Sequence, residues 1–217
     1  MLRGRSRLPL LAEISGPANG RAWALRRDDF ASLREALPRL TEQRALAVVG
    51  EGEAPAVAAI GIAATASASG RSTILVDCDL ARPRLAGSVG LAPGPGLHEY
   101  LRWEAEPRDV LQPVVLAGSG TGDASQLVCI CGGRPAAKAE TLLGLQSFAH
   151  MVAKLRGAYG LVLLLAPPVL TEPAACLAVA AQADAVVAGE VEGSDRAVGK
   201  AIRRLPVPAL GKIAVGV

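Results

Sequence analysis

The stretch RALAVVGEGEAPAVAAIGIAATASASGRSTILVDCDLARPRL, residues 44–85, contains the pattern that decides the fold. It predicts an apolar strand at 46–49, a glycine-rich turn at 50–55, a helix of small residues at about 55–69 and a second apolar strand at 73–76. Two aspartates follow the second strand. This order of elements indicates a βαβ unit that opens with a phosphate-type loop.

The loop has the shape of a phosphate-binding loop without the usual side chains. A functional P-loop ends in Gly-Lys-Ser/Thr, where the lysine reaches the β- and γ-phosphates and the hydroxyl binds Mg²⁺. Here Gly50 and Gly52 are present, but Glu53 takes the lysine position, and Ala54 and Pro55 take the hydroxyl positions. Proline suits the first helical turn, yet it removes an amide that would otherwise point at a phosphate.

The two aspartates after the second strand, Asp77 and Asp79, are the candidate catalytic residues. Carboxylates at the carboxyl end of a parallel strand lie at the usual ligand crevice of an α/β sheet. In a nucleotide enzyme they would hold Mg²⁺ or activate water. The alternative is that one of them caps the next turn, because aspartate is common there.

Strands and helices alternate along the rest of the chain. We expect further helices at 28–40, 97–102, 140–156, 173–182 and 195–205, and further strands at 112–116, 127–130, 161–165, 185–188 and 212–217. Pro38 should end the first of these helices, and the glycine-rich run at 118–123 reads as a turn. The alternation predicts an α/β, doubly wound, mostly parallel sheet flanked by helices, with the very apolar strand 161–165 at its centre.

We expect two parts: a basic N-terminal arm over residues 1–27 and a single P-loop NTPase-like domain over residues 28–217. The arm carries Arg3, Arg5 and Arg7 and is broken by prolines and glycines. It is either a solvated arm or a segment weakly attracted to anionic lipid head groups, at about 1 kcal/mol per basic residue.

Composition excludes several classes of function. The net charge is only +3 and no nucleic-acid-reading motif is present, so no nucleic-acid partner is expected. The helix at about 54–70 is too short and too polar for a membrane span, and no secretory signal is evident. We therefore expect a cytoplasmic location, either free or held at the inner face of the membrane through a partner. The histidines have no ligand spacing, so no metal site is expected. Four cysteines lie in apolar contexts and read as small core residues: Cys78, Cys129, Cys131 and Cys176.

Taken together, these segments resemble one family, the cytoplasmic domain of the bacterial tyrosine kinases that accompany polysaccharide co-polymerases, within the MinD/ParA-like branch of P-loop proteins. Residues 76–83 (VDCDLARP) are the closest match and resemble the family's second Walker motif. Residues 159–170 (YGLVLLLAPPVL) resemble the strand with the Walker B aspartate, whose position is Leu165 here. Residues 8–14, 91–101 and 210–217 resemble other family segments.

The resemblance implies an ATP-dependent protein-tyrosine autokinase that uses ATP and Mg²⁺ in intact members. It also implies a ring-forming helix at 28–34, where Asp28 stands for a glutamate, Arg34 is kept and Ala31 replaces an arginine; Asp28 and Arg34 are thus candidates for oligomerisation. Family kinases carry a tyrosine-rich tail, whereas the tyrosines here are Tyr100 and Tyr159, inside the predicted fold.

The departures at Glu53, Ala54 and Leu165 argue against an active site. At about 4 Å and an effective dielectric constant near 20, one unit-charge pair is worth about 4 kcal/mol, so exchanging lysine for glutamate turns attraction for a polyphosphate into repulsion. We therefore expect a degenerate, pseudokinase-like domain without a bound cofactor. It would act as a scaffold or regulator in exopolysaccharide or capsule synthesis and export.

The expected partners of such a domain are a membrane polysaccharide co-polymerase, a sister kinase or further copies of the chain. Two alternatives stay open. One is a residual ATP-binding tyrosine kinase of the same pathway that uses Gly50, Gly52, Asp77 and Asp79. The other is a MinD/ParA-like membrane-cycling positioning protein, although such proteins need ATP to switch.

Overall fold

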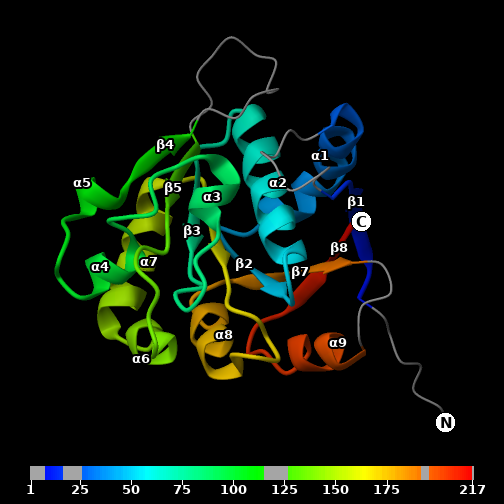
Figure 1. The fold of residues 1–217 in the computed structure, drawn as a ribbon. Helices are drawn as coiled ribbons and strands as arrows, with labels where there is room; N and C mark the ends of the chain where they lie inside the picture. Colours follow the sequence, from blue (N-terminus) through cyan, green and yellow to red (C-terminus); the bar gives the residue numbers. More distant parts are fainter. Residues whose placement is uncertain (1–7, 17–25, 115–126, 192–195, 217) are drawn as a thin grey trace.

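The computed structural model describes residues 8–16, 26–114, 127–191 and 196–216. The described chain forms an eight-stranded sheet in the order β1-β8-β7-β2-β6-β3-β5-β4 (Figure 1). All neighbouring pairs are parallel except β4 and β5. The predicted doubly wound, mostly parallel sheet is confirmed. The strands are β1 Leu10–Ile14, β2 Ala45–Gly50, β3 Thr73–Asp77, β4 Gln112–Val114, β5 Leu127–Ile130, β6 Leu161–Leu165, β7 Ala185–Val191 and β8 Ala209–Val215.

Helices cover both faces of the sheet (Figure 1). One core contains Leu33 of α1 and Ile60 of α2; the other contains Phe148 of α7, Cys176 of α8 and Val198 of α9. The helices are α1 Arg27–Thr41, α2 Ala54–Ala68, α3 Leu85–Val89, α4 Leu97–Leu101, α5 Pro107–Val110, α6 Ala139–Leu143, α7 Gln146–Ala158, α8 Pro173–Ala180 and α9 Arg196–Ile202.

The three central strands place the candidate site. Every residue of β2, β3 and β6 is buried, as expected for parallel strands covered on both faces. Strand β6 lies between β2 and β3, so the prediction of a central strand at 161–165 is confirmed. Leu165 is in register with Val48 on one side and with Asp77 on the other. The carboxyl ends of these strands therefore lie side by side at one edge of the sheet.

Residues 10–14, which the sequence analysis placed in an arm, are part of the sheet. They form β1, which pairs in parallel with β8. Helix α1 covers the outer edge of β1, where the amide of Glu13 donates to Ser32 Oγ at 3.0 Å and the amide of Ser15 donates to Asp29 Oδ1 at 2.8 Å. A five-residue strand gives little local signal, because its pairing partner lies about two hundred residues away in sequence.

Two helix boundaries differ from the predictions. The single helix expected at 140–156 is two helices, because Gly144 ends α6, with its amide donating to the Glu140 carbonyl at 3.0 Å, and Leu145 is extended. Pro38 does not end α1, which runs on to Thr41. Leu40 is buried beyond the proline, and this packing favours one more turn. The expected turn at 118–123 lies outside the described residues.

Candidate functional site

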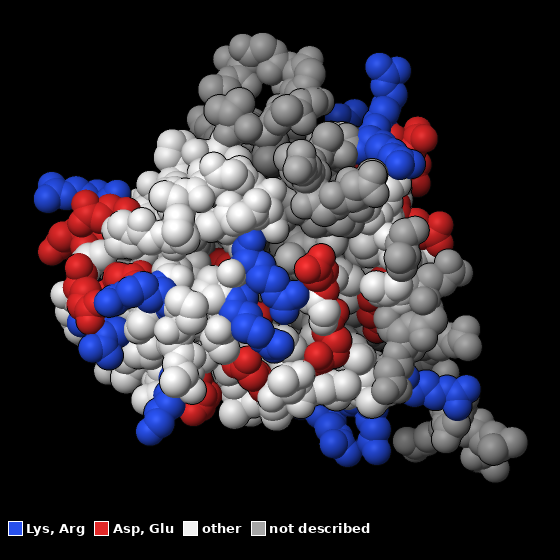
Figure 2. Space-filling view, in the orientation of Figure 1, with Lys and Arg blue, Asp and Glu red and all other residues white. Residues whose placement is uncertain are grey.

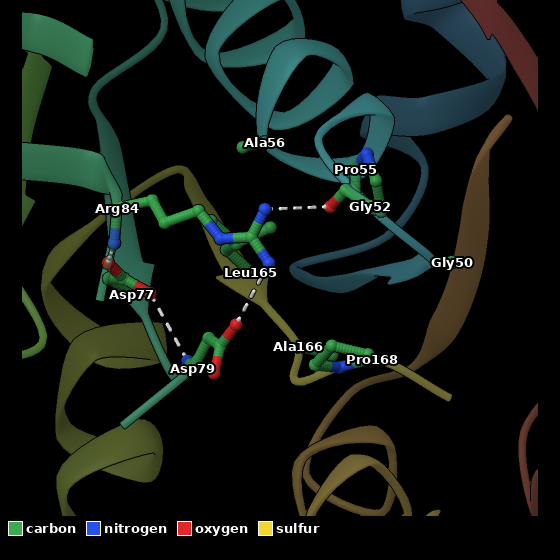
Figure 3. A pocket seen from close by; sticks show the side chains of 10 residues that line it. All are labelled: Gly50, Gly52, Pro55, Ala56, Asp77, Asp79, Arg84, Leu165, Ala166 and Pro168. Atoms are coloured by element: carbon green, nitrogen blue, oxygen red, sulfur yellow. Dashed lines mark hydrogen bonds and ion pairs between the residues drawn. The ribbon is translucent and has the colours of Figure 1, made fainter. Parts of the chain in front are cut away.

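The candidate site is a small cavity where the carboxyl ends of β2, β3 and β6 meet the first turn of α2 (Figure 3). Its volume is about 20 Å³, enough for about one water molecule. Six predicted residues line it together, from three separate parts of the sequence. The lining residues are Gly50, Gly52, Pro55, Ala56, Asp77, Asp79, Arg84, Leu165, Ala166 and Pro168.

The glycines of the loop are required by close packing and by backbone conformation. A Cβ on Gly50 would lie 2.4 Å from the Gly189 carbonyl oxygen and 2.9 Å from the Pro55 ring. Gly52 has a φ of +66°, in the left-handed region that favours glycine. The loop thus keeps the tight path of a phosphate-type loop although its side chains have changed.

The predicted lysine and hydroxyl positions carry neither a cationic nor a hydroxyl side chain. Glu53 is exposed at the N-cap of α2, where its side chain makes no capping hydrogen bond. Ala54 and Pro55 are buried, and Pro55 has no amide hydrogen to donate. Glu51 instead ties the loop to the segment after β6, because its carboxylate accepts hydrogen bonds from the Leu170 amide at 2.5 Å and Thr171 Oγ1 at 3.3 Å.

Asp77 is fully buried and is bonded to backbone amides. Its Oδ1 accepts from the Asp79 amide at 3.1 Å, and its Oδ2 accepts from the amides of Arg84 and Leu85, both at 3.0 Å. Burial raises the pKa of Asp77 to about 6, and these hydrogen bonds oppose that shift. The carboxylate therefore organises the turn between β3 and α3.

Asp79 also faces the cavity and is engaged within the chain. Its Oδ1 accepts from the Arg82 amide at 3.1 Å, and its Oδ2 lies 3.6 Å from Nη2 of Arg84. Burial raises the pKa of Asp79, while the Arg82 hydrogen bond and the nearby arginines lower it less strongly. Both aspartates thus accept hydrogen bonds from amides of the turn after β3, as expected if aspartate caps that turn.

Arg84 is the functional-site residue that sequence reasoning missed. Its guanidinium group lies in the cavity, where Nη1 donates to the Gly52 carbonyl oxygen at 3.2 Å and Nη2 pairs with Asp79 (Figure 3). The side chain thereby connects the phosphate-type loop to the end of β3. The only available signal was a second basic residue shortly after Asp79, at a position that the motifs considered do not include.

The cavity does not fit a magnesium-bound nucleoside triphosphate. Among the described lining residues Arg84 is the one cation, and it is already paired, while none of them carries a hydroxyl. Leu165 stands at the Walker B aspartate position, is 5% exposed and offers no ligand to Mg²⁺. No group of three or more potential metal-ligating side chains occurs in the described part of the chain.

The remaining predicted residues lie elsewhere. Asp28 and Arg34 are exposed on α1, away from the cavity lining. Asp29, rather than Asp28, caps α1, because its Oδ2 accepts from the Arg26 amide at 2.9 Å. All four cysteines are buried and free, which confirms their prediction as core residues. The described helices include none that is long and apolar enough to cross a bilayer.

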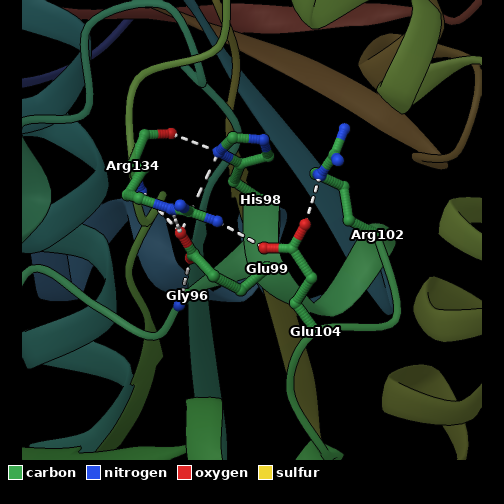
Figure 4. A network of polar contacts seen from close by, with 6 residues as sticks. All are labelled: Gly96, His98, Glu99, Arg102, Glu104 and Arg134. Atoms are coloured by element: carbon green, nitrogen blue, oxygen red, sulfur yellow. Dashed lines mark hydrogen bonds and ion pairs between the residues drawn. The ribbon is translucent and has the colours of Figure 1, made fainter.

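A second polar network lies beside the site and was also missed (Figure 4). The buried carboxylate of Glu99 accepts hydrogen bonds from the Gly96 amide at 2.8 Å, the Arg134 amide at 3.1 Å and Arg134 Nε at 2.9 Å. Burial raises the pKa of Glu99, but these hydrogen-bond donors lower it, and the net effect is a lowered pKa. Glu99 therefore fastens α4 to the loop after β5, a structural role that a lone glutamate in a sequence does not reveal.

Comparison with known proteins identifies the fold. No family model and no curated protein sequence matches the chain. Among solved structures, the chimerical protein CapA2B2 superposes with a TM-score of 0.81 at 16% identity, covering 96% of this chain and 94% of that one. The kinase domain of the Escherichia coli tyrosine kinase ETK gives 0.80 at 20% identity, covering 97% and 91%.

A more distant solved structure shares the same fold. The septum site-determining protein MinD from Pyrococcus horikoshii, complexed with Mg-ADP, gives a TM-score of 0.57 at 16% identity, covering 78% of this chain and 68% of that one. The chain therefore has the P-loop NTPase fold shared by bacterial tyrosine kinase domains and MinD-like proteins. The resemblance expected from the sequence is confirmed at the level of the fold.

Proposed function

We propose that this chain is a catalytically degenerate tyrosine-kinase-like P-loop domain that acts as a scaffold or regulator in exopolysaccharide or capsule synthesis and export. Its proposed partners are a membrane polysaccharide co-polymerase, a sister kinase or further copies of the chain. The exposed side of α1 that carries Asp28 and Arg34 is the proposed contact surface.

One observation carries the proposal: the guanidinium of Arg84 lies between the Gly52 carbonyl and Asp79, inside the cavity of the phosphate-type loop. In a working site a cation faces the phosphates, and a carboxylate beside it helps to hold Mg²⁺. Here the cation is bonded to that carboxylate. The exposed Glu53 adds repulsion for a polyanion, because it stands where the attractive lysine would be.

The pathway follows from the family resemblance and is supported by the fold of ETK and CapA2B2. A residual kinase is the second candidate, favoured by the retention of Asp77 and Asp79 at the end of β3. Its weakness is that both carboxylates already bond to the chain's own amides or to Arg84. A MinD-like positioning protein would need to bind ATP to switch, and the same contacts argue against ATP binding.

The first test is phosphate transfer. The natural chain, incubated with ATP and Mg²⁺, should gain no phosphotyrosine detectable by mass spectrometry. A repaired variant with Glu53→Lys, Ala54→Ser, Leu165→Asp and Arg84→Ala is the matched comparison, because it returns the motif groups and removes the internal cation. Phosphotyrosine on the natural chain, absent from an Asp77→Asn variant, would refute the proposal that the domain is catalytically degenerate and would support a residual kinase.

The second test addresses the scaffold role in the source organism. Deleting the gene should lower the yield of extracellular polysaccharide, and the natural chain should restore it. An Asp79→Asn chain should restore it equally, because no chemistry depends on that carboxylate, whereas Arg34→Glu should restore it poorly. Failure of Asp79→Asn alone, with the protein folded and present at normal levels, would contradict a purely structural role.

A further inference from the structure

The segment of residues 166–172 connects β6 to α8 and borders the candidate site. Ala166 and Pro168 line the cavity (Figure 3). Two consecutive prolines fix the backbone angle φ in this segment and leave it few alternative conformations. Leu170 and Thr171, which follow the prolines, are exposed, so burial alone does not hold them in place. Contacts from another part of the chain fix this exposed end.

The carboxylate of Glu51, in the phosphate-type loop, supplies these contacts. Its Oε1 accepts a hydrogen bond from the Leu170 amide at 2.5 Å, and its Oε2 accepts one from Thr171 Oγ1 at 3.3 Å. Both oxygens of one carboxylate thus hold two adjacent residues, one through its backbone and one through its side chain. Hydrogen bonds to a charged acceptor are stronger than those between neutral groups, so this contact is well suited to fixing an exposed segment.

Two further contacts hold the same segment. The buried Val169 donates its amide hydrogen to the Gly50 carbonyl at 3.1 Å. Arg82 lies 3.7 Å from Glu172, but the Arg82 side chain is 52% exposed, so this ion pair adds little. In the middle of the face shown in Figure 2, where the start of α2 lies above α8 in Figure 1, acidic and basic side chains lie next to one another. Glu51 therefore makes the strongest side-chain contact of this segment.

The segment that Glu51 holds also sets the start of α8. Glu172, next to Thr171, is the N-cap residue of α8. Its amide donates to the Pro168 carbonyl at 2.8 Å, and its carbonyl accepts from the Cys176 amide at 3.0 Å. The Cys176 side chain is fully buried under the first turns of the helix. A displacement of the segment would therefore move the first turn of α8 and expose this thiol.

We propose that Glu51 is an internal latch, which holds the segment between β6 and α8 in one conformation without a ligand. In nucleotide-dependent switch proteins, contacts to the terminal phosphate order a neighbouring loop, and the loop is released when that phosphate is lost. Here an anionic acceptor of the chain itself bonds the loop amide. The inference rests on the proposed function, because a domain that binds no nucleotide needs another anion in this role. The start of α8 is then held permanently.

The test is amide hydrogen exchange of the full chain without nucleotide, resolved at Leu170. Glu51→Ala should speed exchange of this amide by about 10-fold, the factor expected when a hydrogen bond to a charged acceptor is lost. Glu51→Gln should give an intermediate rate, because its amide oxygen still accepts but carries no charge. The matched control is Glu53→Ala, since Glu53 is exposed and makes no capping hydrogen bond. It should leave the rate within about twofold of the natural chain.

A second readout is labelling of Cys176 by iodoacetamide, followed by mass spectrometry. Glu51→Ala should speed labelling of Cys176 and leave that of Cys129, buried in β5, unchanged. Unchanged exchange at Leu170 would overturn the latch, as would equal acceleration at both cysteines, which would show global destabilisation. Unchanged labelling of Cys176 would overturn the link to α8. Nucleotide titration tests the proposed function separately, so the two failures are distinguishable.

Discussion

Replacing Arg84 by alanine tests whether this side chain is the internal cation of the cavity. The substitution removes the ion pair with Asp79 at 3.6 Å and the hydrogen bond to the Gly52 carbonyl at 3.2 Å. It leaves the Asp79 side chain, which is only 7% exposed, facing the cavity without its charged partner. The loop also loses its side-chain connection to the end of β3.

The magnitude follows from the exposure of the two partners. Removing one member of a buried ion pair costs about 3–5 kcal/mol, and a hydrogen bond to a charged group contributes about 1.5–3 kcal/mol. The Arg84 side chain is 31% exposed, so water screens part of the interaction. We expect Arg84→Ala to lower the free energy of unfolding by about 2 kcal/mol at neutral pH.

Urea denaturation measures this loss, with Arg82→Ala as the matched control. Arg82 pairs with Glu172 at 3.7 Å, but its side chain is 52% exposed, so its loss should cost less than about 1 kcal/mol. The Arg84→Ala deficit should also shrink as the pH falls through the raised pKa of Asp79, because a protonated Asp79 no longer needs a cation. A combined Arg84→Ala and Asp79→Asn variant should lose less than the two single losses added together.

Two results would refute this reasoning. One is a loss for Arg84→Ala no larger than that for Arg82→Ala. The other is a loss of the same size at acid and at neutral pH, because the Arg84 contribution depends on a charged Asp79.

Three further predictions concern other parts of the fold. The pKa of Asp77 is raised from 3.8 to about 6, so its contribution to stability is complete below pH 3.8 and is lost as the pH rises through about 6. In urea titrations, the stability of the natural chain relative to Asp77→Asn should therefore fall by about 3 kcal/mol over that pH range. A stability difference that does not change with pH would contradict the raised pKa. Gly133→Ala should lower the melting temperature, because the new Cβ would lie 2.0 Å from Glu99 Oε2 and the backbone has a φ of +83°. The new Cβ of Gly157→Ala in α7 meets nothing within 4 Å, so this variant should be more stable by about 1 kcal/mol. Equal effects of the two substitutions would refute the packing argument. The four buried thiols should react with Ellman's reagent only after unfolding. Burial raises the pKa of Cys131 to about 11 and that of Cys176 to about 12, so these thiols are protonated and unreactive in the folded chain. Rapid labelling of the folded chain would contradict their burial.

The sequence predicted the central sheet well because its signals are local. Strands β2, β3 and β6 are largely apolar runs; Gly50 ends β2, Asp77 ends β3, and two prolines follow β6. Strand β1 escaped prediction because its stability comes from β8 and from capping by Ser32 and Asp29 of α1. The break between α6 and α7 depends on one glycine, Gly144, inside a long amphipathic pattern.

The site was predicted from its motif positions but not from its contacts. Gly50, Gly52, Asp77 and Leu165 line the cavity because adjacent parallel strands end at one edge. The role of Arg84 depends on a turn that Asp77 organises through two amides, and this turn directs the side chain back toward Gly52. The direction in which the Arg84 side chain points produces no periodic pattern and no motif in the sequence.

Calorimetric titration of the natural chain with ATP and with ADP, both with Mg²⁺, measures whether the cavity binds a nucleotide. We expect no heat of binding up to millimolar nucleotide, because Arg84 is paired inside a cavity of about 20 Å³ and Glu53 replaces the lysine. The repaired variant, titrated in parallel, should show measurable binding. A micromolar dissociation constant for the natural chain, lost on Asp79→Asn, would contradict the claim that this site is degenerate.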